Sequence, residues 1–440
     1  MTSDDALEQG TFTWLVGIED TCVYPAPDAG VVLDEFELTG HRTAWRDDLA
    51  TARRLGARAV RYGVSWPLVH VAPGEYDWSI LDDVLAYAVG DLGLEIVADL
   101  VHYGTPTWLE GSFADPRYPE TIAEFAAAFA SRYRRQVRYF TPLNEPITTA
   151  SFCGLRGVWP PSLHGWHGWV TVAVPIAVGM VRATTAIREA NAAAKIVHVE
   201  ASMLISTDEA ELEDHAAHLG MIGWLPTDLM MGRVEPDDEA WTWLVKHGAS
   251  TYDLAWLNAN GVRPDYMGVN YYPDLTPRAL QTVNGEVLQV SHNAWAAGLR
   301  TVLTAFAERY HLPIIITETS IEGSDEVRTD WLTDSMAAID DLIADGVDIR
   351  GYTWWPLMDF VDWSWASGGE NVEEFAVATV DGDGELLVGP TPPLGRPTDG
   401  KNPFLRRMGL VRLQEEGDGE LVRIETDAAI EFSRLAKGPT

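Results

Sequence analysis

The sequence predicts a single (β/α)8 barrel, a closed ring of parallel strands that alternate with helices. Short apolar runs rich in Val, Ile, Tyr and Phe recur along the 440 residues, which is typical of strands buried on both faces. Each run is followed by sequence of helical character, and the right-handed crossover rule leaves few closures other than a barrel. No segment is typical of a linker to a second domain, so residues 1–440 are expected to form one catalytic unit of the size that elaborated barrels reach.

The strands and helices are predicted in order from hydrophobic periodicity and boundary residues. The predicted strands are residues 12–20, 57–66, 94–104, 137–143, 195–202, 264–272, 313–320 and 349–360. The predicted helices lie around residues 45–56, 79–91, 123–136, 183–193, 223–232, 293–310 and 329–346. Ser79 with Asp82, and Thr121 with Glu124, resemble capping boxes and are predicted to begin two of these helices. An apolar run at 169–181 is too short to span a bilayer and indicates a buried helix.

The closing helix is predicted to come late. Glycines and prolines are frequent between Ser364 and Glu425, and the apolar runs at 409–414 and 420–425 flank a Gly-Asp turn. This pattern predicts a β-hairpin inserted in the last βα loop, within an insertion of about residues 385–425. Residues 426–436, capped by Thr426, would then form the last helix of the barrel.

Charge and cysteine content limit the classes of partner. The chain carries 31 basic and 66 acidic residues, a formal net charge of −35. A field of this sign repels polyanions, so we expect neither nucleic acid nor membrane as a partner. The two cysteines and the absence of a basic, apolar leader in the given sequence favour a cytoplasmic location.

Two predicted strands end in a glutamate, and these residues are the main functional candidates. Glu145 ends the run that leads into TPLNEP, and Glu318 lies in ITETS at the end of another. Residues at the C-terminal ends of barrel strands face the mouth of the barrel. If the strands are the fourth and the seventh, the carboxyl groups could lie ~5 to 5.5 Å apart, as a retaining glycosidase requires.

Several motifs in the same order resemble glycoside hydrolase family 1, the β-glucosidase-like retaining enzymes, over roughly the first 380 residues. TPLNEP resembles the family's T-x-N-E-P, which implies that Glu145 is the general acid/base and that Asn144 binds the sugar 2-hydroxyl. ITETS resembles I-T-E-N-G, which implies that Glu318 is the nucleophile. RYGVSW and GVNYY are similar to motifs whose arginine and tyrosine support the nucleophile, here Arg61 and Tyr272. Without the neighbouring motifs, a structural salt bridge inside the barrel would be the favoured interpretation of Arg61.

The resemblance also implies a set of sugar-binding residues. His102 in VHYGTP matches the family's H-[WF]-[DG]-x-P, and Trp355 in YTWWPLMDF would lie under the sugar ring. The other expected substrate contacts are Asn270, Asp362, Trp363 and, at the aglycone entrance, Trp159, with Trp166 and Trp169 as weaker candidates.

The chain departs from the family at one edge of the expected sugar site. Asp362 stands where the family has a glutamate, so its carboxylate is one methylene shorter, and Phe360 replaces an asparagine. Cys22 takes the place of the glutamine of the first loop in ungapped counting, and Glu19 or Asp20 could serve instead. We see no cluster after Trp363 that would bind a 6-phosphate.

The predicted function is a retaining β-glycosidase that acts on a small-molecule or oligosaccharide β-glycoside without a cofactor or metal. His164 and His167 lack nearby partner ligands, and Asp381–Gly384 lacks most of the ligands of a calcium loop. Two alternatives stay open: a transglycosylase on the same barrel, and a non-catalytic sugar-binding protein of this fold. The glycone and the oligomeric state are not predicted.

Overall fold

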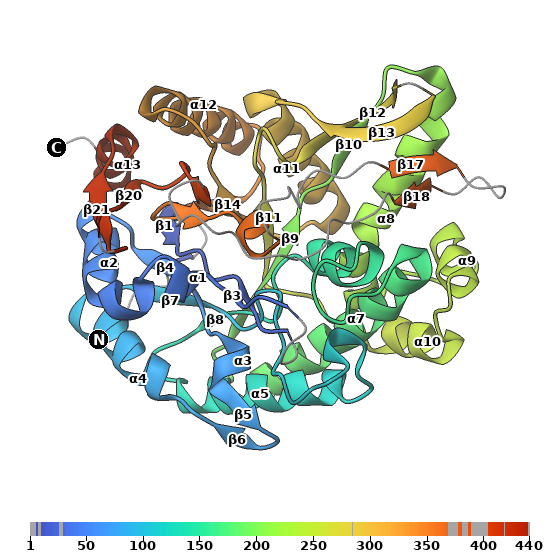
Figure 1. Cartoon of the computed structure of the whole chain (residues 1–440), viewed down its shortest axis with the longest axis horizontal. Coiled ribbons are helices and arrows are strands. Elements are labelled where there is room, and N and C mark those ends of the chain that lie inside the picture. Colours follow the sequence, from blue (N-terminus) through green and yellow to red (C-terminus); the bar gives the residue numbers. More distant parts are fainter. Residues whose placement is uncertain are drawn as a thin grey trace.

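Eight parallel strands close into a barrel, which confirms the predicted fold class (Figure 1). The structure is a computed structural model that describes residues 6–7, 10–25, 30–283, 285–367, 377–380, 386–388, 404–417 and 419–438. The barrel strands are β1 Thr13–Gly17, β4 Ala59–Gly63, β7 Glu95–Asp99, β8 Tyr139–Thr141, β9 Lys195–Ala201, β11 Tyr266–Asn270, β14 Ile314–Thr319 and β15 Ile349–Trp354. Each pairs with its neighbours in chain order, and β15 pairs with β1 to close the ring.

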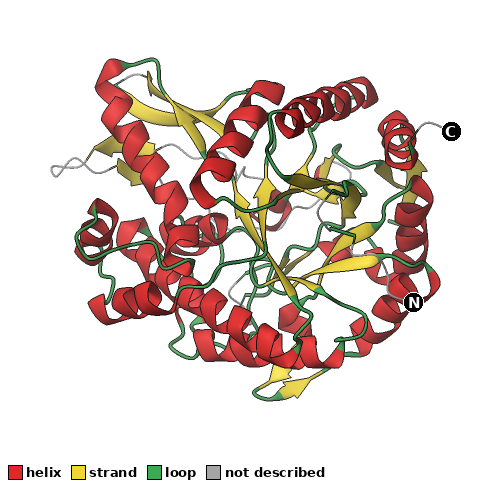
Figure 2. Ribbon diagram, turned by 180° about the vertical axis from the view of Figure 1, so that it is seen from behind, coloured by secondary structure: helices red, strands yellow, loops and turns green. Residues whose placement is uncertain are grey.

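Helices surround the barrel on the outside (Figure 2). The main ones are α2 His41–Leu55, α4 Ser79–Leu85, α5 Tyr118–Arg132, α7 Gly165–Ala190, α8 Glu213–Met230, α11 Trp295–Tyr310, α12 Asp325–Ala344 and α13 Asp427–Lys437. A one-turn helix, α6 Pro146–Ala150, and a π-helical turn, η3 Ser151–Leu155, follow β8, and the short helices α9 Glu239–Lys246 and α10 Thr251–Asn260 follow α8. The apolar faces of the barrel helices pack on the outward-facing side chains of the strands, which forms the main core.

Helix α7 corrects the prediction for the middle of the chain. The sequence predicts an apolar helical run at 169–181 and a helix around 183–193, but one helix runs from Gly165 to Ala190 through Pro175. A proline removes one helical hydrogen bond, and here the surrounding packing compensates for the loss. By length and composition α7 could cross a membrane, yet 72% of its most apolar window is buried inside the protein, as for a core helix.

Both predicted capping boxes are wrong. Helix α4 begins at Ser79 itself, and its amide donates to the Asp77 carboxylate at 2.9 Å. Helix α5 begins three residues before Thr121, whose hydroxyl donates to the Arg117 carbonyl at 2.8 Å. The cap at Thr426 is confirmed, since its side chain accepts the Ala429 amide.

The N-terminal segment closes the bottom of the barrel. Leu7 is fully buried among inward-facing residues of the strands, and this small cluster forms a second core inside the barrel. The Tyr266 hydroxyl and the Arg350 guanidinium both donate to the Leu7 carbonyl, at 3.1 and 3.2 Å. The opposite end, where the strands finish, is therefore the open end.

Extra strands elaborate the loops at that open end. β10 Leu204–Ser206, β12 Pro277–Val283 and β13 Glu286–Ser291 form a separate sheet at one side (Figure 1). The predicted hairpin is present as β20 Val411–Glu415 and β21 Leu421–Glu425 between the last barrel strand and α13. Two further strand pairs precede this hairpin in the chain. They are β16 Phe360–Val361 with β19 Leu405–Arg406, and β17 Val377–Val380 with β18 Leu386–Val388. The Asp381–Gly384 run and most of residues 385–403 lie outside the described residues.

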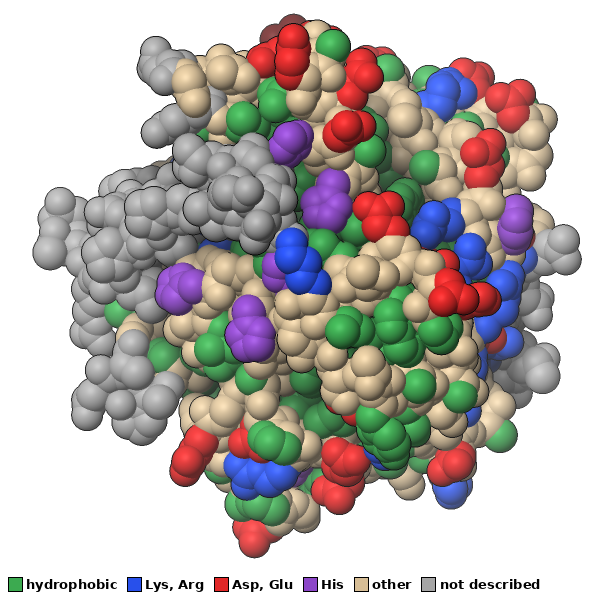
Figure 3. Space-filling view, turned by 90° about the vertical axis from the view of Figure 1, so that its right-hand side faces the viewer, with side chains coloured by type: hydrophobic (Ala, Val, Ile, Leu, Met, Phe, Trp, Pro, Cys, Tyr) green, Lys and Arg blue, Asp and Glu red, His purple; other side chains and the backbone are tan. Residues whose placement is uncertain are grey.

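The described surface on one side of the molecule is mixed in charge. Figure 3 shows acidic and basic side chains interspersed there, with histidines and apolar groups among them. Ion pairing leaves the net charge unchanged, so the excess of 35 negative charges in the sequence keeps the net field acidic.

Candidate active site

Side chains from six of the eight barrel strands or the segments that follow them meet at the open end of the barrel. β4 contributes Arg61, β7 contributes Asp99, and the segment after β8 contributes Asn144 and Glu145. β11 ends in Asn270, with Tyr272 two residues on. β14 contributes Glu318, and Trp355 directly follows β15. This arrangement brings the two predicted carboxylates to one place from residues 173 positions apart.

Glu145 is held in a strained backbone conformation and by two hydrogen bonds. Its φ is 42°, in the left-handed region that side-chain-bearing residues seldom adopt. Pro146 follows as the first residue of α6, a position that tolerates proline. The carboxylate accepts from Tyr103 Oη at 2.6 Å and from Asn270 Nδ2 at 2.7 Å. The strain and the donors together aim the carboxylate into the mouth of the barrel.

Glu318 is positioned by an irregularity in the β11–β14 pairing. The register shifts by one residue, so that Asn270 lies opposite Glu318 while Thr317 is the extra residue. The Thr317 hydroxyl donates to the Asn270 side-chain oxygen at 2.6 Å. The Glu318 carboxylate accepts from Tyr272 Oη at 2.7 Å and forms an ion pair with Arg61.

Arg61 connects four of the strand ends. Its fully buried guanidinium pairs with Glu318 and Asp99 and donates to Asn144 Oδ1 at 2.6 Å. It also lies 4.7 Å from the centre of the Trp355 ring. Burial alone lowers the pKa of Arg61, but the surrounding carboxylates outweigh this and raise it, so the side chain is a permanent cation. The structural and functional roles considered for Arg61 therefore coincide.

The environments of the two glutamates differ in charge. Burial raises the pKa of Glu318 to about 8, and the nearby Glu145 carboxylate contributes to the rise, while the Arg61 guanidinium acts in the opposite direction. The contacts of Glu318 are an arginine and a phenol, whereas the contacts of Glu145 are a phenol and an amide. Arg61 is the only cation among the described residues that touches either carboxylate, and the carboxylate that it contacts is that of Glu318.

His102 is held between two buried carboxylates. Its Nδ1 lies 2.9 Å from Asp99 Oδ2 and 2.9 Å from Asp20 Oδ1, and Asn144 Nδ2 lies 3.2 Å from its Nε2. Burial lowers the pKa of His102, but Asp20 and Asp99 outweigh it and the pKa is raised well above the usual range. Burial in turn raises the pKa of Asp20 to about 6. Gly63 leaves the space that the Asp20 carboxylate fills.

A small cavity of about 70 Å³ lies between the two glutamates. Trp355 forms one wall, and its Nε1 donates to Glu19 at 3.3 Å. Gly17 allows this arrangement because a Cβ there would collide with the Trp355 ring. The cavity is also lined by His102, Tyr103, Tyr272, Leu275, Phe360, Trp363, Arg406 and Met408. Its polar groups and its indole wall suit a pyranose, which has hydroxyls at its edge and C–H bonds on its faces.

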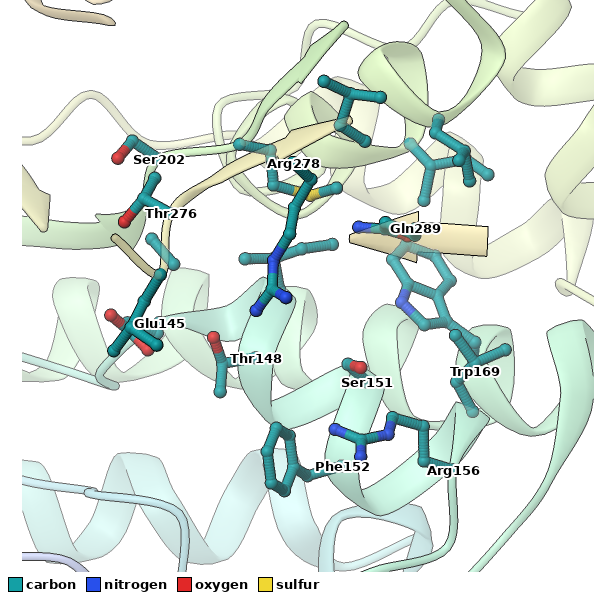
Figure 4. Close-up of a pocket in the computed structure, with 18 of the residues that line it drawn as sticks. Glu145, Thr148, Ser151, Phe152, Arg156, Trp169, Ser202, Thr276, Arg278 and Gln289 are labelled. Carbon is teal, nitrogen blue, oxygen red and sulfur yellow. The ribbon is translucent and has the colours of Figure 1, made fainter. Parts of the chain in front are cut away.

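A larger cavity of about 240 Å³ adjoins the small one on the Glu145 side (Figure 4). Glu145, Tyr272, Leu275 and Trp363 border both cavities. Trp166 and Trp169 line the larger cavity, so these two weaker candidates lie at the entrance predicted for an aglycone.

Four predicted substrate contacts are not among the described residues that line either cavity: Asn144, Asn270, Trp159 and Asp362. Trp159 is 4% exposed and packs behind Tyr103, with ring centres 4.9 Å apart, and it borders neither of the two described cavities. The Asp362 carboxylate pairs with Arg406 at 3.2 Å and accepts the Ser364 amide at 2.8 Å. It is not among the described residues that line the small cavity. Phe360 and Met408 border that edge in its place.

Sequence reasoning missed three residues of the site. Asp99 ends β7 in the same way as Glu318 ends its own strand, and that signal was available. In VHYGTP, Tyr103 stands where the family's motif has tryptophan or phenylalanine, and this difference was the only signal in the sequence. The hydroxyl that tyrosine adds at this position contacts Glu145. Arg406 belongs to a segment without any motif, so nothing in the sequence indicated it.

Glu19, Asp20 and His102 are the one group in the described residues with metal-ligand geometry. The two carboxylates around His102 favour its protonated form, which competes with coordination. The expectation of no metal stays a prediction.

The fold and the site together define a carbohydrate-active (β/α)8 barrel with a buried pair of glutamates. The family description "Glycosyl hydrolase family 1" matches residues 39–383. The chain therefore belongs to glycosyl hydrolase family 1 and is a glycoside hydrolase.

Individual relatives are distant. An aryl-phospho-beta-D-glucosidase of Bacillus subtilis is 24% identical over 73% of this chain and 78% of its own length. A beta-glucosidase of Agrobacterium sp. is 23% identical over 74% and 77%. The solved family 1 beta-glucosidase from Thermotoga maritima superposes with a TM-score of 0.75 at 18% identity, over 97% of this chain and 98% of that one. At this identity the structural likeness concerns the fold alone.

Proposed function

We propose that the protein is a retaining β-glycosidase that hydrolyses β-linked glycosides through a covalent glycosyl-enzyme intermediate. The observation that carries the proposal is the asymmetry of the two glutamates around one cavity. Glu318 lies beside a permanent cation, and Glu145 does not. Such a difference separates the nucleophile from the acid/base.

In the first step the Glu318 carboxylate attacks the anomeric carbon as the bond to the leaving oxygen breaks. Glu145 gives its proton to that oxygen, and the products are the glycosyl ester on Glu318 and a free alcohol. In the second step Glu145 removes a proton from water, whose oxygen attacks the same carbon and releases Glu318. The sugar leaves with its original anomeric configuration. In this proposal His102 and Trp355, which line the small cavity, bind the sugar hydroxyls and the apolar face of the ring. The part expected of Asn144 at the 2-hydroxyl rests on the family resemblance.

A transglycosylase is the second candidate, because the larger cavity beside Glu145 has an aromatic and aliphatic lining. An acceptor alcohol bound there would take the place of water in the second step. A binding protein without catalysis is a weaker alternative, because it has no chemical need for Arg61 and Tyr272 to contact Glu318.

The test is a panel of 4-nitrophenyl β-glycosides, together with a 2-deoxy-2-fluoro glycoside of the sugar that is turned over. We expect a covalent adduct on Glu318, loss of turnover in Glu318→Ala and Glu145→Ala, and rescue of Glu318→Ala by azide to the inverted glycosyl azide. Turnover without any adduct would refute the retaining mechanism, and a folded protein without turnover or adduct would refute the enzyme. Product analysis with added alcohols separates hydrolysis from transfer. A cytoplasmic location remains part of the proposal.

A further inference from the structure

Glu200 is a buried carboxylic acid on the outer face of the barrel wall. It lies on β9, where Val197 and Val199 belong to the cluster inside the barrel. Since side chains alternate along a strand, His198 and Glu200 point outward, to the layer of helices. Glu200 is 1% exposed, and no arginine or lysine of the described residues forms an ion pair with it. A buried acid without a cation is costly, so its hydrogen bonds must compensate.

One Glu200 oxygen caps the helix that follows Glu145. Glu200 Oε1 accepts the Ile147 amide at 3.2 Å and the Ala201 amide at 2.9 Å. Ile147 is the second residue of α6, and its amide is one of the donors that a helix cannot satisfy internally. Pro146 before it has no amide hydrogen. Glu200 therefore supplies, from the neighbouring strand, the acceptor that the start of this helix needs.

The residue in the capping position of α6 is the expected acid/base itself. Glu145 directly precedes the helix, and a side-chain oxygen at that position commonly accepts the amide of the second or third helical residue. The Glu145 side chain makes no such bond. Its carboxylate accepts from Tyr103 and Asn270 in the mouth of the barrel instead. A carboxylate that capped its own helix would be drawn away from the small cavity.

Two neighbouring residues of β9 hold the strained backbone at Glu145. The Glu145 amide donates to the Val199 carbonyl at 3.1 Å, and the Ile147 amide donates to Glu200. Left-handed conformations of this kind cost about 1 to 3 kcal/mol and persist only where the surroundings fix them. These two bonds fix the chain at Glu145 and again two residues later.

The second oxygen of Glu200 faces away from α6. The Thr227 hydroxyl lies 3.3 Å from Glu200 Oε2 and 2.8 Å from His198 Nε2. Burial raises the pKa of Glu200 well above its usual range, and the Glu145 carboxylate contributes to the rise. Burial lowers the pKa of His198 to about 3. Burial thus favours the uncharged form of both groups, and an uncharged amide of the same shape can take the place of Glu200.

From these contacts we propose that Glu200 is a positioning residue for the acid/base: it caps α6 in place of Glu145 and leaves the Glu145 carboxylate free to reach the leaving oxygen. This role rests on the proposed glycosidase activity, in which Glu145 protonates that oxygen. Without Glu200, the Ile147 amide has no acceptor from β9. It would then draw the Glu145 carboxylate toward itself and away from the substrate.

The test uses Glu200→Leu, which has a similar size but no acceptor, and two aryl glycosides of the sugar that is turned over. A dinitrophenolate leaves without a proton, whereas phenol needs a general acid. We expect kcat/KM of Glu200→Leu to fall about 10- to 100-fold for the phenyl glycoside and to stay within about threefold for the 2,4-dinitrophenyl glycoside. Labelling of Glu318 by a 2,4-dinitrophenyl 2-deoxy-2-fluoro glycoside should likewise keep its rate.

Three further variants separate positioning from a structural role. Glu200→Met also lacks an acceptor and should reproduce the selective loss. Glu200→Gln retains an acceptor oxygen for the Ile147 amide, so kcat/KM for both substrates should stay within about threefold of the wild type. Thr227→Val is the matched control, because it removes the other side-chain contact of Glu200 without touching α6. It should leave the ratio of the two substrates unchanged.

Unchanged rates, or equal losses for the two substrates, in Glu200→Leu and Glu200→Met would overturn the inference while the glycosidase activity stands. A selective loss of the same size in Glu200→Gln would also overturn it. Failure of both apolar variants to fold, with Glu200→Gln folded and active, would overturn it as well, since Glu200 would then support the barrel rather than the acid/base. A wild type without turnover and without labelling would instead refute the proposed function.

Discussion

Tyr103→Phe tests how the hydroxyl of Tyr103 controls the acid/base. The substitution removes the phenol that donates to Glu145 at 2.6 Å and accepts from Asn144 Nδ2 at 2.9 Å. It retains the ring and its contacts with Trp159 and Trp363, whose centres lie 4.9 and 5.4 Å away. Phenylalanine is also one of the residues that the family has at this position.

A hydrogen bond to a carboxylate favours the ionised form, so we expect its loss to move the basic limb of the kcat/KM profile to higher pH. Hydrogen bonds to charged groups contribute about 1.5 to 3 kcal/mol, and 1.36 kcal/mol corresponds to a tenfold change in a proton equilibrium. The basic limb of the kcat/KM profile should therefore move up by about one to two pH units. Asn270 still donates to Glu145, which favours the lower end of that range.

The measurement is a pH profile of kcat/KM with a 4-nitrophenyl glycoside for the wild type and the variant. Tyr271→Phe is the control, because it also removes a tyrosine hydroxyl hydrogen bond, at 2.8 Å to the Trp295 carbonyl, away from the glutamates. A basic limb that stays in place, or moves to lower pH, with the fold intact would refute the reasoning.

Four further outcomes follow from the site. Arg61→Met removes the cation beside Glu318 and leaves buried carboxylates unpaired. We therefore expect kcat/KM to fall at least about 100-fold and the free energy of unfolding in urea to fall by about 3 to 5 kcal/mol. A variant as stable as the wild type would contradict this. The pKa of Glu318 at about 8 predicts an acid limb of kcat/KM well above pH 4.5, and a limb near 4.5 would contradict it. Because the folded-state pKa of Glu318 is raised above the unfolded value, protonated Glu318 stabilises the folded protein; this contribution is complete below pH 4.5 and is lost as pH rises through about 8. Urea titrations should show this loss of unfolding free energy in the wild type and a smaller loss in Glu318→Gln. Gly17→Ala places a methyl group against the Trp355 ring, so it should cost about 1 to 3 kcal/mol by thermal unfolding and lower kcat/KM for every sugar, whereas retained activity would mean that the ring can shift freely.

The barrel and the catalytic pair could be predicted because both depend on local patterns. Buried parallel strands have a simple hydrophobic signature, and the residue that ends such a strand has a fixed location at the mouth. These two rules were sufficient to predict that Glu145 and Glu318 lie at one site.

The remaining details depend on partners distant in sequence. The carboxylate of Asp362 is directed by Arg406, 44 residues later, in a segment without a motif. The capping prediction at Ser79 failed because Asp77 competes for the same amide. The runs at 169–181 and 183–193 belong to one helix that continues through Pro175, because tertiary packing overrides the preference of a single residue.

The buried guanidinium of Arg61 makes catalytic competence depend on the closure of the ring. From β4 it contacts groups of β7, β14 and the segment after β8 at once. A slip of one residue in any of these strands would turn the contributing side chain to the opposite face. A molecule with native helix content but one displaced strand would therefore have no activity. The fraction of molecules that a fluoro-glycoside can label would then measure the yield of correctly registered barrels, which circular dichroism does not report.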